Sequence, residues 1–310
     1  MTEELEVIHV QICLLTYRRP ELLRAALESL LCQSAIAMPG VAMHVLVVDN
    51  HDEQSGRAVF DEVLRGSDAV SARYLCEPAR GLSIARNRAL SESLAMDFVA
   101  FIDDDEVADA GWLERLLGGA REFDAAVVTG PVWPRHVQSP GWVVRGGFFN
   151  AAQQPTGTDV DFVATNNVLL RREIVATFRF DSRFDSTGGE DTEYFMRIKR
   201  AGAKMVWMNE AIVYECVPPG RANARWLLSR ARSDANRYTR SCLSFDRGAH
   251  TMGRRFVVAC GGFLAGLGTL PMGLLGKQHA VRGLQLMSRA IGTVSALLGR
   301  EQAFYGPTHG

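Results

Sequence analysis

Three consecutive carboxylates, Asp103, Asp104 and Asp105, directly follow the apolar run FVAFI. Because side chains alternate along a strand, we expect Asp103 and Asp105 to point to one side and Asp104 to the other. Adjacent carboxylates repel each other, and a hard cation with oxygen ligands relieves that repulsion. A solvated acidic surface is the alternative, but the position directly after a buried strand favours a Mg²⁺ or Mn²⁺ site.

A second acidic group, Glu190 and Asp191, follows Gly188 and Gly189 at the start of a helical stretch. Carboxylates in the first turn of a helix interact favourably with its dipole, which is the structural alternative. A carboxylate at the edge of a cleft can instead accept the proton of an attacking hydroxyl group. The adjacent glycines would let that hydroxyl approach the backbone closely.

A nucleotide site is indicated by Asp49 and by three arginines near Gly81. Asp49 ends an apolar strand and is either a turn residue or an acceptor of hydrogen bonds from a base or ribose. The arginines could neutralise a diphosphate, or they could be solvated charges on a helix face. They are Arg80, Arg86 and Arg88.

Several common catalytic motifs are missing from the sequence. It contains no GxxxxGK[ST] loop, no strand-linked GxGxxG and no nucleophile elbow, which argues against ordinary NTPases, dinucleotide enzymes and serine hydrolases. The six cysteines include no CxxC pair and no zinc-ligand spacing, so buried reduced thiols are expected. The acidic start MTEELEVIHV has no secretory signal, which predicts a cytoplasmic catalytic domain.

Alternating strands and helices must position these residues. The first half of the chain predicts a β-α-β-α-β order, and therefore a mostly parallel sheet with helices on both faces. Ligands of such sheets bind at the carboxyl ends of the strands, where Asp49 and the acidic triplet lie. The expected strands are 7–15, 45–48, 72–76 and 98–102, and the expected helices are 21–31, 55–65 and 83–94. Further strands are expected at 125–130, 160–170 and 206–213, a long functional loop at 131–160, and a helix at 190–201.

The 310 residues, 47% of them hydrophobic, are enough for a sizeable core, and a net charge of −1 argues against a nucleic-acid partner. The charge is uneven, because residues 218–255 carry nine arginines against two aspartates. Residues 256–276 then contain no charge, and about 20 such residues can span a membrane. We expect membrane attachment here, with a buried helical hairpin or a dimer interface as alternatives, and an interfacial stretch at 284–299. The expected organisation is a catalytic domain over 1–217, a basic helical linker over 218–255, and an apolar helical region over 256–310.

Five segments, in order and with consistent spacing over residues 8–217, resemble the inverting family 2 glycosyltransferases. These enzymes have the A-type nucleotide-sugar fold, and the segment VPPGRANARWLL suggests a bacterial exopolysaccharide-type member. The matching segments are ICLLTYRRPELLRAALESLLCQ, VLVVDN, GLSIARNRAL, FIDDDE followed by WLERL, and GGEDTEYFMRIKRAG.

The resemblance implies a role for each matching residue. Asp191 would be the catalytic base, Glu190 would help to place the acceptor, and Asp105 would bind the divalent metal. Asn166 and Asn167 would contact the donor sugar. The nucleoside and diphosphate would be held by Thr16, Tyr17, Asp49, Arg86, Asn87 and Asp103.

The expected partners are a nucleotide-sugar donor, most simply a UDP-sugar, and a sugar or lipid-linked acceptor at the cytoplasmic face of the inner membrane. One departure concerns the metal site, because many relatives have a histidine after the late strand where this chain reads Tyr214 and Glu215. Either residue could substitute for it. A sugar nucleotidyltransferase and a non-catalytic membrane-associated scaffold on the same fold are the competing functions.

Overall fold

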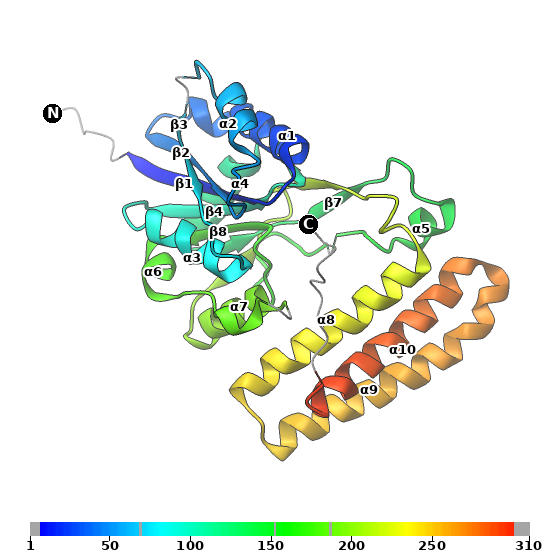
Figure 1. Ribbon diagram of the computed structural model, residues 1–310. Helices are drawn as coiled ribbons and strands as arrows, with labels where there is room; N and C mark the ends of the chain where they lie inside the picture. Colours follow the sequence, from blue (N-terminus) through cyan, green and yellow to red (C-terminus); the bar gives the residue numbers. More distant parts are fainter. Residues whose placement is uncertain (1–6, 68–69, 152, 186–187, 301–310) are drawn as a thin grey trace.

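Figure 1 shows the computed structural model of the chain, which describes residues 7–67, 70–151, 153–185 and 188–300. Its centre is a seven-stranded sheet in the order β3-β2-β1-β4-β8-β6-β9. The strands are β1 (Ile8–Thr16), β2 (Val41–Asp49), β3 (Ser71–Cys76), β4 (Phe98–Asp103), β6 (Val127–Thr129), β8 (Asn167–Arg171) and β9 (Met205–Trp207).

The sheet is mostly parallel, as the sequence predicts. β1 pairs in parallel with β2 and β4, and β2 pairs in parallel with β3. β8 runs antiparallel to both of its neighbours, β4 and β6. The register aligns Thr16 with Asp49, and Leu15 with Asp103, so the carboxyl ends of β1, β2 and β4 meet at one edge.

Two apolar cores lie on opposite faces of this sheet because successive strand side chains alternate. Val45 and Val47 of β2 belong to one core, whereas Leu46 and Val48 belong to the other. The first core includes residues of α1 (Pro20–Leu31), α2 (Arg57–Val63) and α4 (Trp112–Glu122). The second includes residues of α3 (Leu82–Glu92), α6 (Arg172–Thr177) and α7 (Glu190–Arg200). The α/β fold with helices on both faces is therefore confirmed.

A smaller sheet has the order β5-β10-β7. Its strands are β5 (Glu106–Ala108), β7 (Val132–Arg135) and β10 (Val213–Cys216). β10 pairs antiparallel with β5, and this brings Glu215 opposite Glu106. The small sheet thus continues from the acidic end of β4. The short helical turns are η1 (Ser34–Ala37), η2 (Ser182–Phe184) and η3 (Leu270–Leu275).

Three predicted elements differ from the structure. The predicted strand at 160–170 is wrong in its first half, because Val160 and Val163 enter the core from irregular backbone and β8 begins only at Asn167. The predicted strand at 206–213 is two strands, β9 and β10, which belong to different sheets. The predicted loop at 131–160 contains β7 and α5 (Gly141–Gly146). Continuous apolar runs do not reveal where a chain leaves one sheet for another.

The C-terminal region is helical, with α8 (Ala224–Phe245), α9 (Ala249–Thr269) and α10 (Lys277–Leu297). α10 packs along both α8 and α9, and α8 also contacts α7. Figure 1 shows the three helices side by side, with α8 towards the sheet. Within the described residues, the stretch Ala249–Leu275 is long enough and apolar enough to cross a membrane.

Candidate active site

The acidic triplet lies at the carboxyl end of β4, as predicted. Asp103 is the last residue of the strand, and Asp104 and Asp105 form the turn that leads into β5. The Oδ2 of Asp104 accepts a 2.7 Å hydrogen bond from the Thr16 hydroxyl, and its Oδ1 lies 3.5 Å from the Arg19 guanidinium. Burial raises the pKa of Asp104 to about 6, and the Thr16 hydrogen bond opposes this shift. Thr16 therefore ties the end of β1 to the acidic turn.

Asp103 and Asp105 form the centre of a cluster of like charges. Burial, followed by repulsion from Asp105, raises the pKa of Asp103 to about 7. Burial and repulsion from Asp103 raise the pKa of Glu106 well above its usual value. The pKa of Glu215 is raised by burial and by Asp105. A cation at this cluster would lower all three pKa values by removing the mutual repulsion.

Two arginines partly balance these carboxylates. The Arg19 guanidinium lies 3.6 Å from Asp105, and the Arg221 guanidinium lies 3.7 Å from the same carboxylate. Arg221 also forms a 2.6 Å ion pair with Glu215. Of the two residues that could replace the late histidine, Glu215 joins the cluster, whereas the ring of Tyr214 lies under the Arg135 guanidinium, 4.2 Å from its centroid.

A buried ion pair joins α3 to the N-terminus of α7, beside the acidic turn. Arg86 of α3 donates to Glu190 at 2.6 Å, and both side chains are less than a tenth exposed. The same guanidinium interacts electrostatically with Asp103 and Asp191. Arg86 is therefore a common neighbour of Asp103, predicted to contact the donor, of Glu190, predicted to place the acceptor, and of Asp191, the predicted base.

Asp191 lies in the first turn of α7, where its Oδ1 accepts a 2.6 Å hydrogen bond from the Thr192 backbone N–H. Burial and repulsion from Glu190 raise the pKa of Asp191, while Arg86 and Arg237 oppose the shift. Arg237 comes from α8, and its stem packs on Gly188 and Gly189. A Cβ on Gly188 would lie 2.9 Å from Arg237 Cδ, and both glycines have positive φ angles, so this tight approach depends on glycine.

The predicted nucleoside residues lie at the neighbouring strand ends. Asp49 is fully buried, and its carboxylate accepts hydrogen bonds from the backbone N–H groups of His51 and Gly56 and from the Tyr74 hydroxyl at 2.5 Å. Asp49 thus fixes the loop after β2. Tyr17 is half-buried, and the guanidinium groups of Arg18 and Arg80 each lie 5.5 Å from the centroid of its ring.

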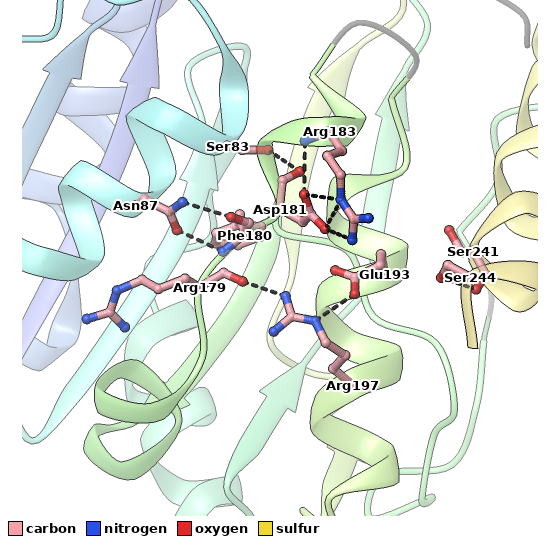
Figure 2. A network of polar contacts seen from close by, with 10 residues as sticks. All are labelled: Ser83, Asn87, Arg179, Phe180, Asp181, Arg183, Glu193, Arg197, Ser241 and Ser244. Atoms are coloured by element: carbon pink, nitrogen blue, oxygen red, sulfur yellow. Dashed lines mark hydrogen bonds and ion pairs between the residues drawn. The ribbon is translucent and has the colours of Figure 1, made fainter.

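The side-chain amides of the three asparagines predicted to contact the donor form hydrogen bonds within the protein; these residues are Asn87, Asn166 and Asn167. Asn87 pairs with the backbone N–H and carbonyl of Phe180, both at 2.8 Å, as Figure 2 shows. This places the Phe180 ring under Arg86, 5.4 Å from the guanidinium. Asn166 donates to Glu106 at 2.8 Å and so lies beside the acidic cluster.

Asn167 lies in a buried position beside α4 and is hydrogen-bonded within the protein. Its side chain is buried, accepts a 2.8 Å hydrogen bond from Trp112 Nε1, and donates to the carbonyls of Pro131 and Ala211. These bonds hold α4 against the strands on either side. Both N–H groups of this amide are therefore used within the protein.

The sequence interpretation assigned no place in the site to four further residues. They are Arg19, Glu106, Arg221 and Arg237. The segment that contains Arg221 was noted only for its resemblance and its positive charge. Arg237 lies 46 positions after Asp191, and only the packing of α8 on α7 brings the two together.

A sequence model described as Glycosyl transferase family 2 matches residues 11–178, and one described as Glycosyl transferase family group 2 matches residues 98–296. The succinoglycan biosynthesis protein ExoM of Rhizobium meliloti (strain 1021) is 34% identical over 304 residues, which cover 96% of this chain and 95% of the relative.

Solved structures of S. aureus TarS share the fold. The crystal structure of TarS 1–349 with UDP has a TM-score of 0.54 and 15% identity, and covers 97% of this chain and 95% of TarS 1–349. The corresponding complex with UDP-GlcNAc has a TM-score of 0.55 and 13% identity, with coverage of 96% and 99%.

The hydrogen bonds of Asn167 predict a structural effect of its removal. We expect Asn167→Ala to lower the free energy of unfolding by about 2–3 kcal/mol, because it leaves the buried Trp112 N–H and two carbonyls without hydrogen-bond partners. Urea unfolding followed by tryptophan fluorescence measures this change. Asn166→Ala, which removes one bond to Glu106, serves as the control and should cost less. An unchanged stability together with weakened donor binding would show that Asn167 contacts the sugar after all.

Proposed function

Because the chain belongs to glycosyl transferase family 2, we propose that it is an inverting enzyme that moves a sugar from a nucleoside-diphosphate donor to a hydroxyl acceptor. Its likeness to ExoM, a succinoglycan biosynthesis protein, supports an acceptor in bacterial cell-surface polysaccharide or glycolipid synthesis. The UDP and UDP-GlcNAc in the TarS complexes support a UDP-sugar donor. The observation that carries the proposal is the buried ion pair of Arg86 with Glu190, because the same guanidinium also interacts electrostatically with Asp103 and Asp191.

Asp103 and Asp105 are the residues that would hold a divalent metal. Mg²⁺ and Mn²⁺ favour one or two protein carboxylates completed by substrate phosphates, and the raised pKa of Asp103 fits a site that gains from a cation. The described residues contain no group of three or more His, Cys, Asp or Glu side chains placed to enclose an ion. Two carboxylates plus a diphosphate therefore match the donor set. When bound, the metal would supply positive charge to the leaving diphosphate.

The protein's own groups account for the remaining steps. Arg19 and Arg221 flank Asp105 and can turn towards diphosphate oxygens. Asp191, ionised, would remove the proton of the acceptor hydroxyl, whose oxygen attacks the anomeric carbon as the diphosphate leaves from the opposite face. Glu190 Oε2 is buried and has no hydrogen-bond partner among the described residues, so this oxygen can accept a bond from the acceptor sugar.

The three parts of the chain would have different roles. Residues 1–217 would bind donor and acceptor, and residues 218–255 and 256–310 would connect this region to the cytoplasmic face of the inner membrane. The apolar stretch Ala249–Leu275 supports that location.

The base assignment predicts a selective loss of transfer. Asp191→Asn should reduce kcat by about 10²–10⁴-fold, the range for a general base, while the Kd for UDP changes little. Sugar transfer and calorimetric UDP binding measure the two effects. Asp181→Asn is the matched control, because its carboxylate pairs with the exposed Arg183 instead. Transfer at the parental rate in Asp191→Asn would rule out this base.

The raised pKa of Asp191 predicts a pH dependence. Since only the ionised carboxylate accepts a proton, kcat should fall on acidification at a pH above the usual aspartate range of about 3.9. Arg237→Gln keeps most of the aliphatic part of the side chain on the two glycines, but it removes the positive charge that lowers the pKa of Asp191. The acidic side of the kcat–pH profile should therefore move to higher pH. Arg172→Gln, whose guanidinium pairs with Asp97 just before the start of β4, at the opposite end of that strand from Asp103, should leave the profile in place. An identical profile in Arg237→Gln would contradict the electrostatic contact.

The acidic cluster predicts metal dependence. Transfer should be lost in EDTA and restored by Mn²⁺ or Mg²⁺, and Asp105→Asn should raise the metal concentration needed for half-maximal activity at least tenfold. The control is Asp109→Asn, which follows β5 and whose carboxylate accepts a hydrogen bond from the Gly111 backbone N–H. Full activity of the EDTA-treated parent chain would exclude the metal site.

A further inference from the structure

The outward face of α9 is apolar and exposed. Phe256, Val257, Leu264 and Leu267 are 52%, 69%, 66% and 50% exposed, although the helix is packed against α10 along its length. The following turn adds Leu274 and Leu275, which are 95% and 76% exposed. A continuous apolar surface of this kind indicates a contact with a partner or a membrane.

A groove lies beside this face, between α9 and α10. Its volume is about 560 Å³, and its walls are formed mainly by Phe263 and Leu264 of α9 and by Ile291, Val294 and Leu298 of α10. Arg232 and Arg300 also line it. A hydrocarbon chain with a negatively charged head fits such a lining, because apolar walls and guanidinium groups are combined in one groove.

The charge of this region is entirely positive. From Arg247 to Arg300 the sequence contains seven lysines and arginines and no aspartate or glutamate. Arg254 is exposed and lies one turn before Val257 and Val258 on α9. Basic residues beside an apolar face attract anionic lipid headgroups. A protein partner with an apolar surface would not require this complete lack of carboxylates.

The packing decides how α9 can lie against a bilayer. α9 and α10 approach so closely that a Cβ on Gly266 would lie 2.6 Å from the Gly283 carbonyl oxygen. α10 is fixed in turn to α8, where Asn236 donates to the Gly292 carbonyl at 3.2 Å. A membrane-spanning α9 would therefore draw the arginine-rich α8 into the hydrocarbon, at a cost of about 2.5–3.5 kcal/mol per charge. Lying in the membrane plane avoids this cost.

We propose that the outward face of α9 and the α9–α10 groove form a binding surface for anionic phospholipids, with α9 lying parallel to the bilayer at the headgroup level. The groove takes an acyl chain, and the arginines contact phosphate groups. This inference deepens the membrane contact of the proposed function and rests on it. It differs from a transmembrane anchor, because the helices leave the bilayer core free of protein.

Sedimentation of the full-length protein with vesicles tests the surface. The parent chain should bind vesicles of phosphatidylcholine with 30% phosphatidylglycerol and bind pure phosphatidylcholine at least tenfold more weakly. The double variant Val257→Glu, Leu264→Glu should lose binding at least tenfold. Val137→Glu, at an equally exposed valine outside the helices, is the control and should bind as the parent does. Arg254→Ser should weaken binding about fivefold, or ~1 kcal/mol, and Arg115→Ser on α4 should not.

Three results would overturn the proposal. Equal binding to both vesicle types would exclude recognition of anionic lipid. Resistance to alkaline carbonate extraction would indicate a span rather than an in-plane helix. A dimer in analytical ultracentrifugation that Val257→Glu, Leu264→Glu converts to a monomer without changing vesicle binding would assign the face to a second copy. Calorimetric measurement of UDP binding distinguishes failure of the proposed function from failure of the lipid surface. Absence of UDP binding in the parent chain counts against the proposed function. Retention of UDP binding in a variant that no longer binds vesicles supports the lipid surface.

Discussion

The buried ion pair between Arg86 and Glu190 is the constraint on which the site depends. It joins α3 to α7, two helices that are 104 residues apart at these positions, and both partners are almost fully withdrawn from water. Removing one partner of such a pair leaves an uncompensated buried charge, which typically costs 3–5 kcal/mol. The guanidinium also neighbours Asp103 and Asp191. One positive charge therefore helps to stabilise three buried carboxylates, those of Asp103, Glu190 and Asp191.

The carboxylates of the acidic cluster attract cations, and their mutual repulsion opposes folding. Asp103, Glu106 and Glu215 all have raised pKa values because burial removes water and their neighbours repel them. Arg19 and Arg221 offset part of this repulsion from the edge of the cluster. Since both arginines pair with Asp105, their guanidinium groups would be positioned to donate hydrogen bonds to a diphosphate bound beside that residue. The small sheet contributes Glu215, so it belongs to the site as well as to the scaffold.

The parts of the site that follow from local pattern were predictable. A buried strand that ends in Asp103 places that residue at the edge of a parallel sheet, and the GGED segment places Asp191 at a helix start. Long-range contacts were not predictable. Asn87 and Asn167 have amide groups suited to a ligand, but backbone groups of Phe180, Pro131 and Ala211 occupy them. Likewise, the pattern could not choose between Tyr214 and Glu215, because that depends on which strand lies opposite.

The contact of Arg237 with Gly188 and Gly189 has a consequence for how related sequences can vary. The stem of the arginine fills the space that any side chain at either glycine would require, and the positive φ angles add a second restriction. Position 237 and this glycine pair are therefore expected to change together or not at all. The residue at position 237 in the C-terminal bundle thereby restricts the loop before α7, and we expect these two regions to diverge as one unit.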